Sequence, residues 1–308
     1  MKLKTLILVE TPLQLLCACE YMRVNNGDFR LCMRKSYVGI NDQQMDAMVT
    51  ELGMKVDWIF RVKPGDKVAY AKALVAFIFL RFPVYDKVVI GSYYSGLFKV
   101  FSSIAVKKDL VLLDDGVASL LADKLIKEKM PKKYSAFSIF SLDPTAYKNY
   151  QLNSFDSIAR EYACVENPEY AVFFIGQMQL VDRGMMEMDA YIRVLEAVAK
   201  AADGRVVHYI PHRNENPESI MRIKALGGIE ILCADVAIEY FMLRNRWYPQ
   251  KIYSIISTAL FTLASLFPKA DTTMVRPSSL KTERFVHYGM IIDALKQHAS
   301  MIKFLDVK

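Results

Sequence analysis

Short apolar runs recur along this chain, and most are followed by polar or glycine residues and then by a helical pattern. Runs of this length are typical of strands that are buried on both faces of a parallel sheet. Strands that alternate with helices throughout predict a doubly wound α/β fold. In the first half, strands are predicted at residues 5–9, 37–40, 56–60, 87–90 and 111–113, and helices from residue 12 onward and at residues 43–52, 71–82 and 117–129.

The second half repeats this scheme, so the chain is expected to hold two Rossmann-like units of similar size. The polar, proline-containing stretch Glu166-Asn167-Pro168-Glu169 is typical of a linker, which predicts domains at residues 1–165 and 166–308. In outline this is the GT-B glycosyltransferase architecture, with a ligand in the cleft between the two sheets. Strands are predicted at residues 170–177, 205–210, 229–232 and 251–256. Helices are predicted at residues 189–201, 237–243 and 283–305, the last packing back across both domains, and a core helix is expected to begin at Ser257-Thr258 within the apolar run 252–267.

Composition restricts the class of protein. The 308 residues are 53% hydrophobic and 24% charged, which is typical of a folded globular protein. The five cysteines are scattered and form no Cys-x-x-Cys pair, so neither a zinc site nor a disulfide framework is expected. Scattered thiols fit a reducing cytoplasm. No run reaches the ~18 apolar residues that a membrane-spanning helix needs, and the predicted location is therefore cytoplasmic.

The net charge of +7 indicates a negatively charged partner, or simply a basic surface. Nucleic acid is not expected, because the basic residues form no dense run and no nucleic-acid-binding motif is present. An anionic membrane face, to which each nearby lysine would contribute about 1 kcal/mol, and an anionic small molecule both stay open as partners. The lysines proposed for membrane contact are Lys124, Lys127, Lys129, Lys132 and Lys133.

Two carboxylates and a glycine, Asp114-Asp115-Gly116, follow the predicted strand at residues 111–113. The carboxyl ends of strands are where open α/β sheets bind ligands. Two neighbouring carboxylates also tend to raise the pKa of one of them, which suits a base that works near neutral pH. The alternative is that the two aspartates are only turn and helix-cap residues.

Other polar residues stand where predicted strands end or helices begin, and each has a simpler structural interpretation. Thr11 and Gln14 at one helix start, and Gly91-Ser92 after a strand, are candidate substrate loops or ordinary turns. His212 and Arg213 follow the strand at residues 205–210, and His212 alone would be read as a structural histidine. Glu239 alone would be a solvated helix charge. Ser257-Thr258, which precede an apolar helix, suit a phosphate or a helix cap.

The order of these motifs resembles that of the bacterial GT-B sialyltransferases. Those enzymes carry an acidic-acidic-Gly motif, a His-Pro motif and a paired Ser/Thr motif. The phrases Thr11-Pro12-Leu13-Gln14 and Tyr209-Ile210-Pro211-His212-Arg213 are most similar to the lipooligosaccharide sialyltransferases of glycosyltransferase family 52 and the polysialyltransferase-related group. The similarity extends over nearly the whole chain. Two positions depart from the pattern: Arg213 stands where many relatives have proline, and Thr258 replaces a second serine but keeps the hydroxyl.

The resemblance implies a role for each matching residue. Asp115 would be the general base that takes the proton of the acceptor hydroxyl, and Asp114 would support or position it. His212, with Arg213 beside it on the donor side, would donate to the phosphate of the CMP leaving group. Ser257 and Thr258 would hold the same phosphate, and Glu239 would accept hydrogen bonds from the cytidine.

The implied reaction is an inverting transfer of sialic acid from CMP-sialic acid to a hydroxyl of a bacterial surface glycan, either lipooligosaccharide or capsule. The transition state needs a base on the acceptor side and donors on the phosphate side, and domain closure should bring them together. No metal and no cofactor are expected. The partners would be the nucleotide-sugar donor and a glycan or glycolipid acceptor, and a homodimer is possible because dimers are common in related enzymes. The family's acceptors are often lipid-linked glycans made at the cytoplasmic face of the inner membrane, so peripheral contact with that anionic membrane is also expected. Two alternatives stay open: transfer of another nonulosonic acid, Kdo or a hexose from a nucleotide sugar, and nucleotide-sugar binding without catalysis.

Overall fold

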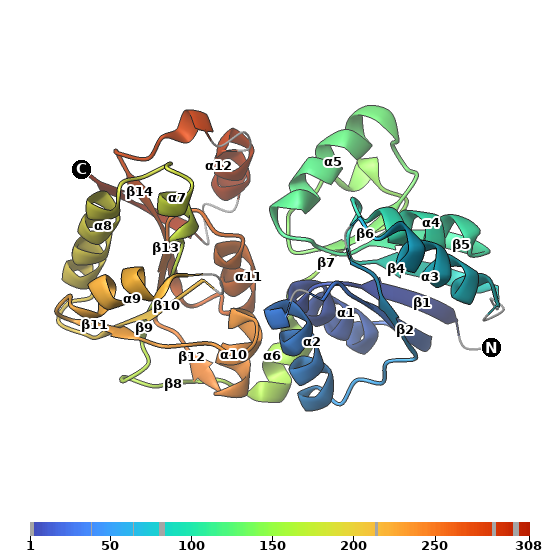
Figure 1. Cartoon of the computed structure of the whole chain (residues 1–308), viewed down its shortest axis with the longest axis horizontal. Coiled ribbons are helices and arrows are strands. Elements are labelled where there is room, and N and C mark those ends of the chain that lie inside the picture. The colour runs from blue at the N-terminus through green and yellow to red at the C-terminus, as the bar shows by residue number, and fades with distance from the viewer. Residues whose placement is uncertain are drawn as a thin grey trace. The chain divides into compact units, whose positions relative to one another are not determined.

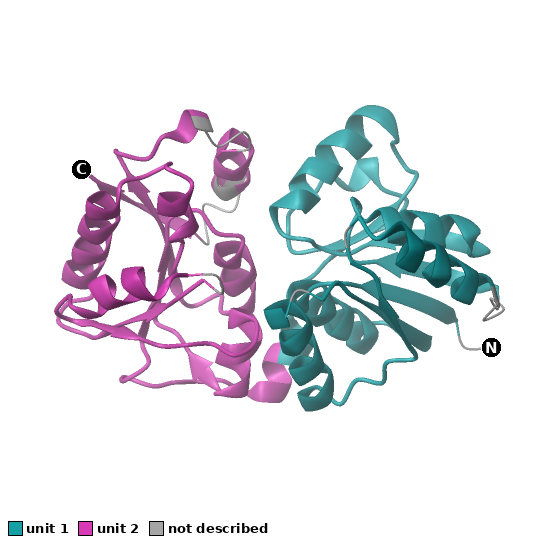
Figure 2. Ribbon diagram, in the orientation of Figure 1, with its two compact units in different colours: residues 1–158 teal, residues 159–308 magenta. Residues whose placement is uncertain are grey.

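The computed structural model describes residues 3–37, 39–63, 65–79, 84–212, 215–284, 288–297 and 302–308. The chain separates into two compact units, residues 1–158 and 159–308 (Figure 2). The division that the sequence predicts after residue 165 falls within β8 (Val165–Glu166), a two-residue strand of the second unit. Each unit is an α/β structure with a parallel sheet, as the alternation of strands and helices predicts.

The first unit is built on a seven-stranded parallel sheet with the order β3-β2-β1-β4-β5-β6-β7. The chain leaves β1 in one direction to form β2 and β3 and returns to form β4 on the other side. Ile7 of β1 therefore pairs with Leu31 on one side and with Val89 on the other. The strands are β1 (Lys4–Val9), β2 (Asp28–Lys35), β3 (Trp58–Arg61), β4 (Tyr85–Ile90), β5 (Lys107–Leu112), β6 (Ser135–Ser138) and β7 (Tyr150–Leu152).

Helices cover both faces of this sheet. Helices α1 and α2 pack together on one face. Helices α3 and α4 pack together on the other face, and α5 lies on that same face (Figure 1). Aromatic rings fill the space under α3 and α4, where the Phe77 and Phe101 rings stack with centroids 3.9 Å apart. The helices are α1 (Pro12–Val24), α2 (Gly39–Glu51), α3 (Lys67–Phe79), α4 (Gly96–Ile104), α5 (Val117–Lys129), the 3-10 turn η1 (Pro144–Ala146) and α6 (Asp156–Tyr162), which contains the division between the units.

The prediction of a strand at residues 37–40 is wrong. The second strand is β2, Asp28–Lys35, and Gly39 already begins α2. The strand was missed because it carries charged residues, each of which has a partner in the fold. Arg34 pairs with Glu10 at 2.7 Å, and Lys35 pairs with Asp46 at 2.5 Å. Satisfied charges at the end of a buried strand hide the apolar pattern on which strand prediction depends.

The second unit is built on a six-stranded parallel sheet with the order β11-β10-β9-β13-β14-β15, and a two-stranded pair, β12-β8, lies outside it. The order again reverses at its first strand, β9, which lies between β10 and β13. The strands of the sheet are β9 (Val172–Ile175), β10 (Val207–Ile210), β11 (Ile229–Ile231), β13 (Lys251–Ser254), β14 (Asp271–Pro277) and β15 (Ile302–Val307), and β12 is Trp247–Tyr248.

In this unit α8 and α9 lie on one face of the sheet, and α10 and α11 pack together on the other (Figure 1). The predicted long helix at residues 283–305 is wrong at its end. Helix α12 ends at Gln297, and Ile302–Val307 form strand β15, parallel to β14. The helices are α7 (Gln179–Asp182), α8 (Met188–Ala201), α9 (Pro217–Lys224), α10 (Ile238–Arg244), α11 (Ala259–Leu266), the 3-10 turn η2 (Thr282–Arg284) and α12 (Tyr288–Gln297).

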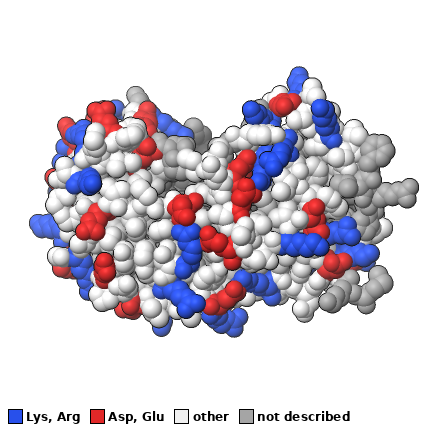
Figure 3. All heavy atoms as spheres, turned by 60° about the horizontal axis from the view of Figure 1, so that its bottom comes forward, with Lys and Arg blue, Asp and Glu red and all other residues white. Residues whose placement is uncertain are grey.

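Acidic and basic side chains are interspersed over the face of the molecule in Figure 3, so the net positive charge is not gathered into one patch there. None of the helices in the described ranges combines the length and the apolar character that crossing a bilayer requires.

Candidate functional site

The two aspartates after β5 lie in different environments. Asp114 is fully buried, and both of its oxygens accept hydrogen bonds. Ser138 Oγ donates to Oδ1 at 2.6 Å, and the Ile139 backbone N–H donates to Oδ2 at 2.6 Å. Burial raises the pKa of Asp114 to about 6, with the Asp115 charge as a lesser cause. These hydrogen bonds join the end of β5 to the end of β6, and this geometry suits Asp114 to holding Asp115 in position.

Asp115 is only half-buried, and it is held from across the sheet. Gln14 Nε2 donates to Asp115 Oδ1 at 2.7 Å. Within the described ranges, Oδ2 receives no hydrogen bond from the protein. An oriented carboxylate with one free oxygen is what a general base needs in order to accept a proton from a substrate hydroxyl.

The alternative interpretation of the aspartate pair as helix-cap residues is wrong. The residue at the N-terminal cap of α5 is Gly116, and no side chain caps that helix. Gly116 has φ +65° and ψ −141°, a conformation that only glycine adopts readily. The Asp115 N–H donates to Ser119 Oγ at 2.8 Å, and the Ser119 side chain also interacts with the Asp114 carboxylate. Neither carboxylate therefore caps α5.

The reversal of strand order at β1 and β4 brings Gln14, one of the predicted N-terminal residues, to Asp115. Gln14 is fully buried, and its Oε1 accepts a hydrogen bond from the Glu10 N–H at 2.9 Å. Because that atom must be the acceptor, the amide nitrogen is the atom that faces Asp115. Gly91 makes this approach feasible, since a Cβ there would lie 2.2 Å from Gln14 Oε1.

The other two predicted loop residues of the first unit have local roles. Thr11 caps α1, where its Oγ1 accepts a hydrogen bond from the Gln14 N–H at 3.3 Å. Ser92 is buried, and its Oγ accepts from the Tyr94 N–H at 3.3 Å. The aspartate pair also lines a narrow pocket with Tyr93. This pocket has a volume of about 20 Å³, room for a single water.

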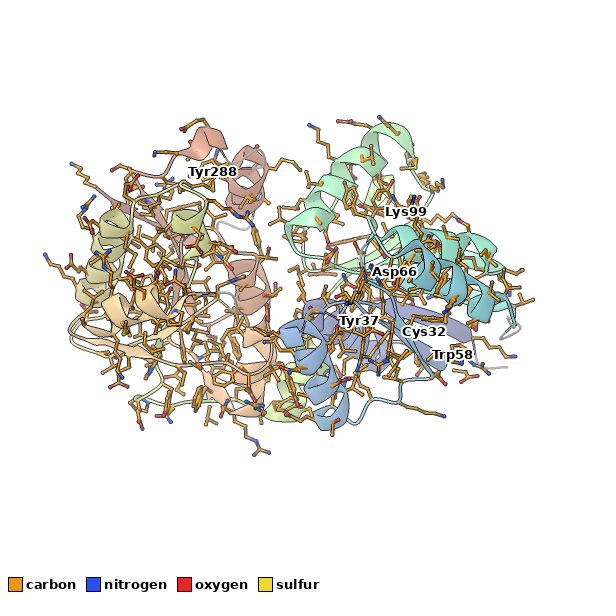
Figure 4. The ribbon with its side chains drawn as sticks, in the orientation of Figure 1. Cys32, Tyr37, Trp58, Asp66, Lys99 and Tyr288 are labelled. Atoms are coloured by element: carbon orange, nitrogen blue, oxygen red, sulfur yellow. The ribbon has the colours of Figure 1, made fainter. Side chains whose placement is uncertain are left out.

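Sequence reasoning missed Glu10, which follows β1. Its Oε2 accepts hydrogen bonds from Arg34 Nη1 at 2.7 Å and from Ser95 Oγ at 3.2 Å. Burial raises the pKa of Glu10, although the Arg34 charge opposes the shift. Arg34 also lines a cavity of about 310 Å³ together with Asp66, which is labelled in Figure 4. One signal in the sequence could have identified this group. Polar residues stand after β1, at the end of β2 and just before α4, and β2, β1 and β4 are neighbouring strands of the sheet.

In the second unit, His212 follows β10 and is half-buried. The Glu215 N–H donates to the His212 carbonyl at 2.8 Å. Arg213, the predicted donor-side residue beside His212, lies outside the described residues.

Glu215 is a second residue that sequence reasoning missed. Its Oε1 accepts hydrogen bonds from Tyr209 OH at 2.5 Å and from the Met178 N–H at 3.2 Å. The Tyr209 hydroxyl also lies 3.0 Å from Tyr191 OH, which accepts from the Gln177 N–H at 2.8 Å. Burial raises the pKa of Glu215 to about 7. Its second oxygen is buried and has no hydrogen-bond partner in the described part of the chain.

Glu239 is not a solvated helix charge, because its side chain is buried. Its carboxylate accepts a hydrogen bond from Thr262 Oγ1, which joins α10 to α11. At the start of α11, Ser257 Oγ accepts from the Ala259 N–H at 3.2 Å, so this serine acts in part as a cap. Thr258 occupies the cap position and makes no side-chain cap bond.

The carboxyl ends of β10 and β13, which precede His212 and Ser257, face the same edge of the parallel sheet with β9 between them. Two strand spacings separate β10 from β13, a span of about 10 Å. Across the described residues, His, Cys, Asp and Glu side chains do not gather in groups of three that could hold a metal ion. Metal-independent activity stays a prediction.

No protein-family model matches the chain, and no curated protein sequence matches it. Solved structures do. The UDP-GlcNAc 2-epimerase of Methanocaldococcus jannaschii, solved with UDP-GlcNAc and UDP, has a TM-score of 0.59 at 12% identity and is matched over 96% of this chain and 92% of that one.

Two transferase structures are also similar. E. coli heptosyltransferase WaaC, solved with ADP-2-deoxy-2-fluoro heptose, has a TM-score of 0.50 at 12% identity over 90% of this chain and 89% of that one. A glycosyltransferase from Rickettsia africae ESF-5 has a TM-score of 0.51 at 11% identity over 97% and 92%. At such identities the likeness shows the fold alone. The predicted fold class, two Rossmann-like domains as in GT-B proteins, is confirmed.

Proposed function

We propose that this protein is an inverting glycosyltransferase that uses a nucleotide sugar, with CMP-sialic acid as donor and a hydroxyl of a bacterial surface glycan as acceptor. The observation that carries the proposal is Asp115, a half-buried carboxylate oriented by Gln14 at the carboxyl edge of the sheet, with one oxygen free. The fold is shared with structures that were solved with UDP-GlcNAc and with an ADP-heptose analogue. The CMP-sialic acid donor rests on the order of the sequence motifs.

In the proposed reaction, Asp115 Oδ2 takes the proton of the acceptor hydroxyl while the acceptor oxygen forms a bond to the anomeric carbon of the donor. The bond between the anomeric carbon and the phosphate oxygen breaks, its electron pair leaves with CMP, and the anomeric centre inverts. Positive or hydrogen-bonding groups must stabilise the charge that develops on the phosphate. His212, Ser257 and Thr258 of the second unit are assigned this role.

Asp114 is assigned the role of holding Asp115 in place, because its own oxygens are already occupied by Ser138 and Ile139. Glu239 is assigned to the cytidine, as the sequence pattern implies. Its bond to Thr262 would then fix the carboxylate in one orientation between α10 and α11.

A second candidate donor class is favoured by the comparisons. Two of the similar structures carry UDP-GlcNAc and an ADP-heptose analogue, so transfer of a hexose or a heptose fits the same fold. Transfer of another nonulosonic acid or of Kdo is the alternative that the sequence motifs leave open. A donor panel separates these alternatives: CMP-sialic acid, CMP-Kdo, UDP-GlcNAc and ADP-heptose are each incubated with the full-length protein, and nucleotide release is measured. We expect release of CMP from CMP-sialic acid. Turnover confined to UDP- or ADP-sugars would overturn the sialyltransferase proposal.

A further inference from the structure

A cavity of about 410 Å³ in the first unit is lined by five lysines. They come from separate segments: Lys99 from α4, Lys107 and Lys108 from β5, and Lys133 and Lys148 from the turns before β6 and β7. Lys99 is labelled in Figure 4. The volume lies within the range of small-molecule sites, about 300–1,000 Å³. Nothing in the assignment of the transfer reaction uses this cavity.

The positive charge of the cavity is largely uncompensated. The one carboxylate in its lining, Asp109, accepts a hydrogen bond from Ser135 Oγ at 2.7 Å. Lys108 pairs with Asp86 at 2.6 Å. Among the described residues, the other four lysines of the lining form no ion pair. Ammonium groups held near one another repel, and a bound anion would relieve that repulsion.

Lys107 is the least exposed of these lysines. Lys107 Nζ donates a hydrogen bond to the Ser102 carbonyl. Burial and the neighbouring Lys148 charge lower the pKa of Lys107. A neighbour of opposite charge would favour the charged form instead. Together with the five lysines of its lining, this gives the cavity the positive electrostatic character that suits an anionic ligand.

Two tyrosine rings lie beside the lysines. Lys99 Nζ is 4.4 Å from the centroid of the Tyr93 ring, and Lys133 Nζ is 5.6 Å from that of Tyr134. The two rings meet edge to face, with centroids 5.9 Å apart. Flat apolar faces next to positive charges suit a ligand with both a carbon face and an anionic group. A sugar that carries a carboxylate or a phosphate has this chemistry.

Tyr93 also lines the narrow pocket of Asp114 and Asp115, so the lysine cavity adjoins the candidate catalytic carboxylates within one unit. We propose that the lysine cavity binds a carboxylate- or phosphate-bearing sugar residue of the acceptor, while the reacting hydroxyl of the same acceptor lies at Asp115. The cavity's affinity for an anionic sugar stands on the geometry alone. Its role as an acceptor subsite rests on the proposed function.

Binding is tested first, without any transfer reaction. The full-length protein is titrated calorimetrically with glucose 6-phosphate, glucuronic acid and glucose. The cavity variant is Lys99→Gln/Lys133→Gln. The control is Lys124→Gln/Lys129→Gln, which removes the same charge from exposed positions of α5 outside the cavity lining. We expect one or both anionic sugars to bind more tightly than glucose, and the cavity variant to weaken that binding about tenfold or more.

The relative affinity of the two anionic sugars shows whether the lysine cavity prefers a phosphate or a carboxylate, and either preference supports the proposal. Equal binding of all three sugars, or equal weakening by the control variant, would overturn it. Thermal unfolding of both variants shows whether they are folded.

Transfer assays then separate this inference from the proposed function. With charged and neutral acceptors that end in the same sugar, the cavity variant should raise the acceptor KM for the charged one and leave kcat unchanged. Active enzyme without that KM difference would refute the acceptor subsite and leave the function standing. If the protein bound anionic sugars but turned over no nucleotide sugar, the proposed function would be refuted and the anion-binding cavity would stand.

Discussion

Gln14 and Asp115 are joined by a hydrogen bond of 2.7 Å between Nε2 and Oδ1, although 101 residues separate them in the sequence. Gln14 can make this bond in one orientation only, because the Glu10 N–H already donates to its Oε1 at 2.9 Å. The strand-order reversal at β1 and β4 creates the contact, since it places the start of α1 near the end of β5. The amide thus orients the candidate base and leaves its other oxygen free.

Gln14→Glu tests this orientation. The variant keeps the side-chain shape but places a second carboxylate against Asp115, and like charges disfavour the ionised base. Because a general base must be deprotonated, the acidic limb of the pH–rate profile should move to higher pH by about one unit or more. Gln43→Glu, at an exposed position of α2, is the control and should leave the profile unchanged. Superimposable profiles for Gln14→Glu and the wild type would contradict the assigned role.

Gly91→Ala tests the close approach from the other side. A Cβ at this position would lie 2.2 Å from Gln14 Oε1 and 2.6 Å from its Cδ. The fully buried Gln14 has to move, so we expect a loss of about 1–3 kcal/mol in the free energy of unfolding and a fall in transfer rate. Gly96→Ala is matched to it, because a Cβ there meets nothing within 4 Å. Chemical denaturation of both variants measures the difference, and equal stability would refute the steric argument.

Glu215 should make the stability of the protein depend on pH. Its folded-state pKa is raised to about 7 by burial, above the ordinary value of 4.5, so the folded state binds more protons than the unfolded state between these values. The free energy of unfolding contributed by this group therefore falls as pH rises from 4.5 to 7.

Glu215→Gln removes that contribution, so the variant should gain stability relative to the wild type as pH rises through this window. Glu218→Gln, at an exposed position of α9, is the control. Thermal unfolding in buffers from acid to neutral pH measures the effect. A stability difference that does not change with pH would contradict the raised pKa.

The exposed lysines on and after α5 should attach the protein to anionic membranes. Lys124, Lys127, Lys129, Lys132 and Lys133 are all exposed, and Lys127 pairs with Asp123 at 2.7 Å. Flotation with phosphatidylglycerol-containing vesicles should recover more protein than flotation with phosphatidylcholine alone. Lys124→Glu/Lys129→Glu should abolish the difference, whereas Lys55→Glu/Lys72→Glu, a matched exposed pair, should not. Equal recovery with both lipids would count against membrane contact.

Sequence patterns predicted most of the architecture because parallel strands and amphipathic helices have distinct periods. Residues 117–129 were predicted as a helix with the bounds that the structure gives. The failures have particular causes. Strand β2 carries charges whose partners, such as Asp46 for Lys35, are distant in the sequence. Strand β15 is a half-exposed edge strand whose apolar pattern continues that of α12.

The candidate site was predictable where a short motif carries the chemistry and was not where contacts between distant segments do. Asp114 and Asp115 look equivalent as a dipeptide, yet one is fully buried and the other is held by Gln14. Glu10 and Glu215 are single acidic residues in loops, and only the fold shows that Arg34 and Tyr209 bind them. Glu239 was selected from motif order, but its burial against Thr262 could not be foreseen.

Asp115→Asn tests the central claim most directly. Release of CMP from CMP-sialic acid is measured with a bacterial lipooligosaccharide acceptor for the wild type, Asp115→Asn and the control Glu128→Gln, an exposed carboxylate on α5. We predict that Asp115→Asn loses about 10²-fold or more of the transfer rate, while its unfolding temperature and CMP binding stay unchanged, and that Glu128→Gln keeps the full rate. Transfer by Asp115→Asn at the wild-type rate would contradict the account.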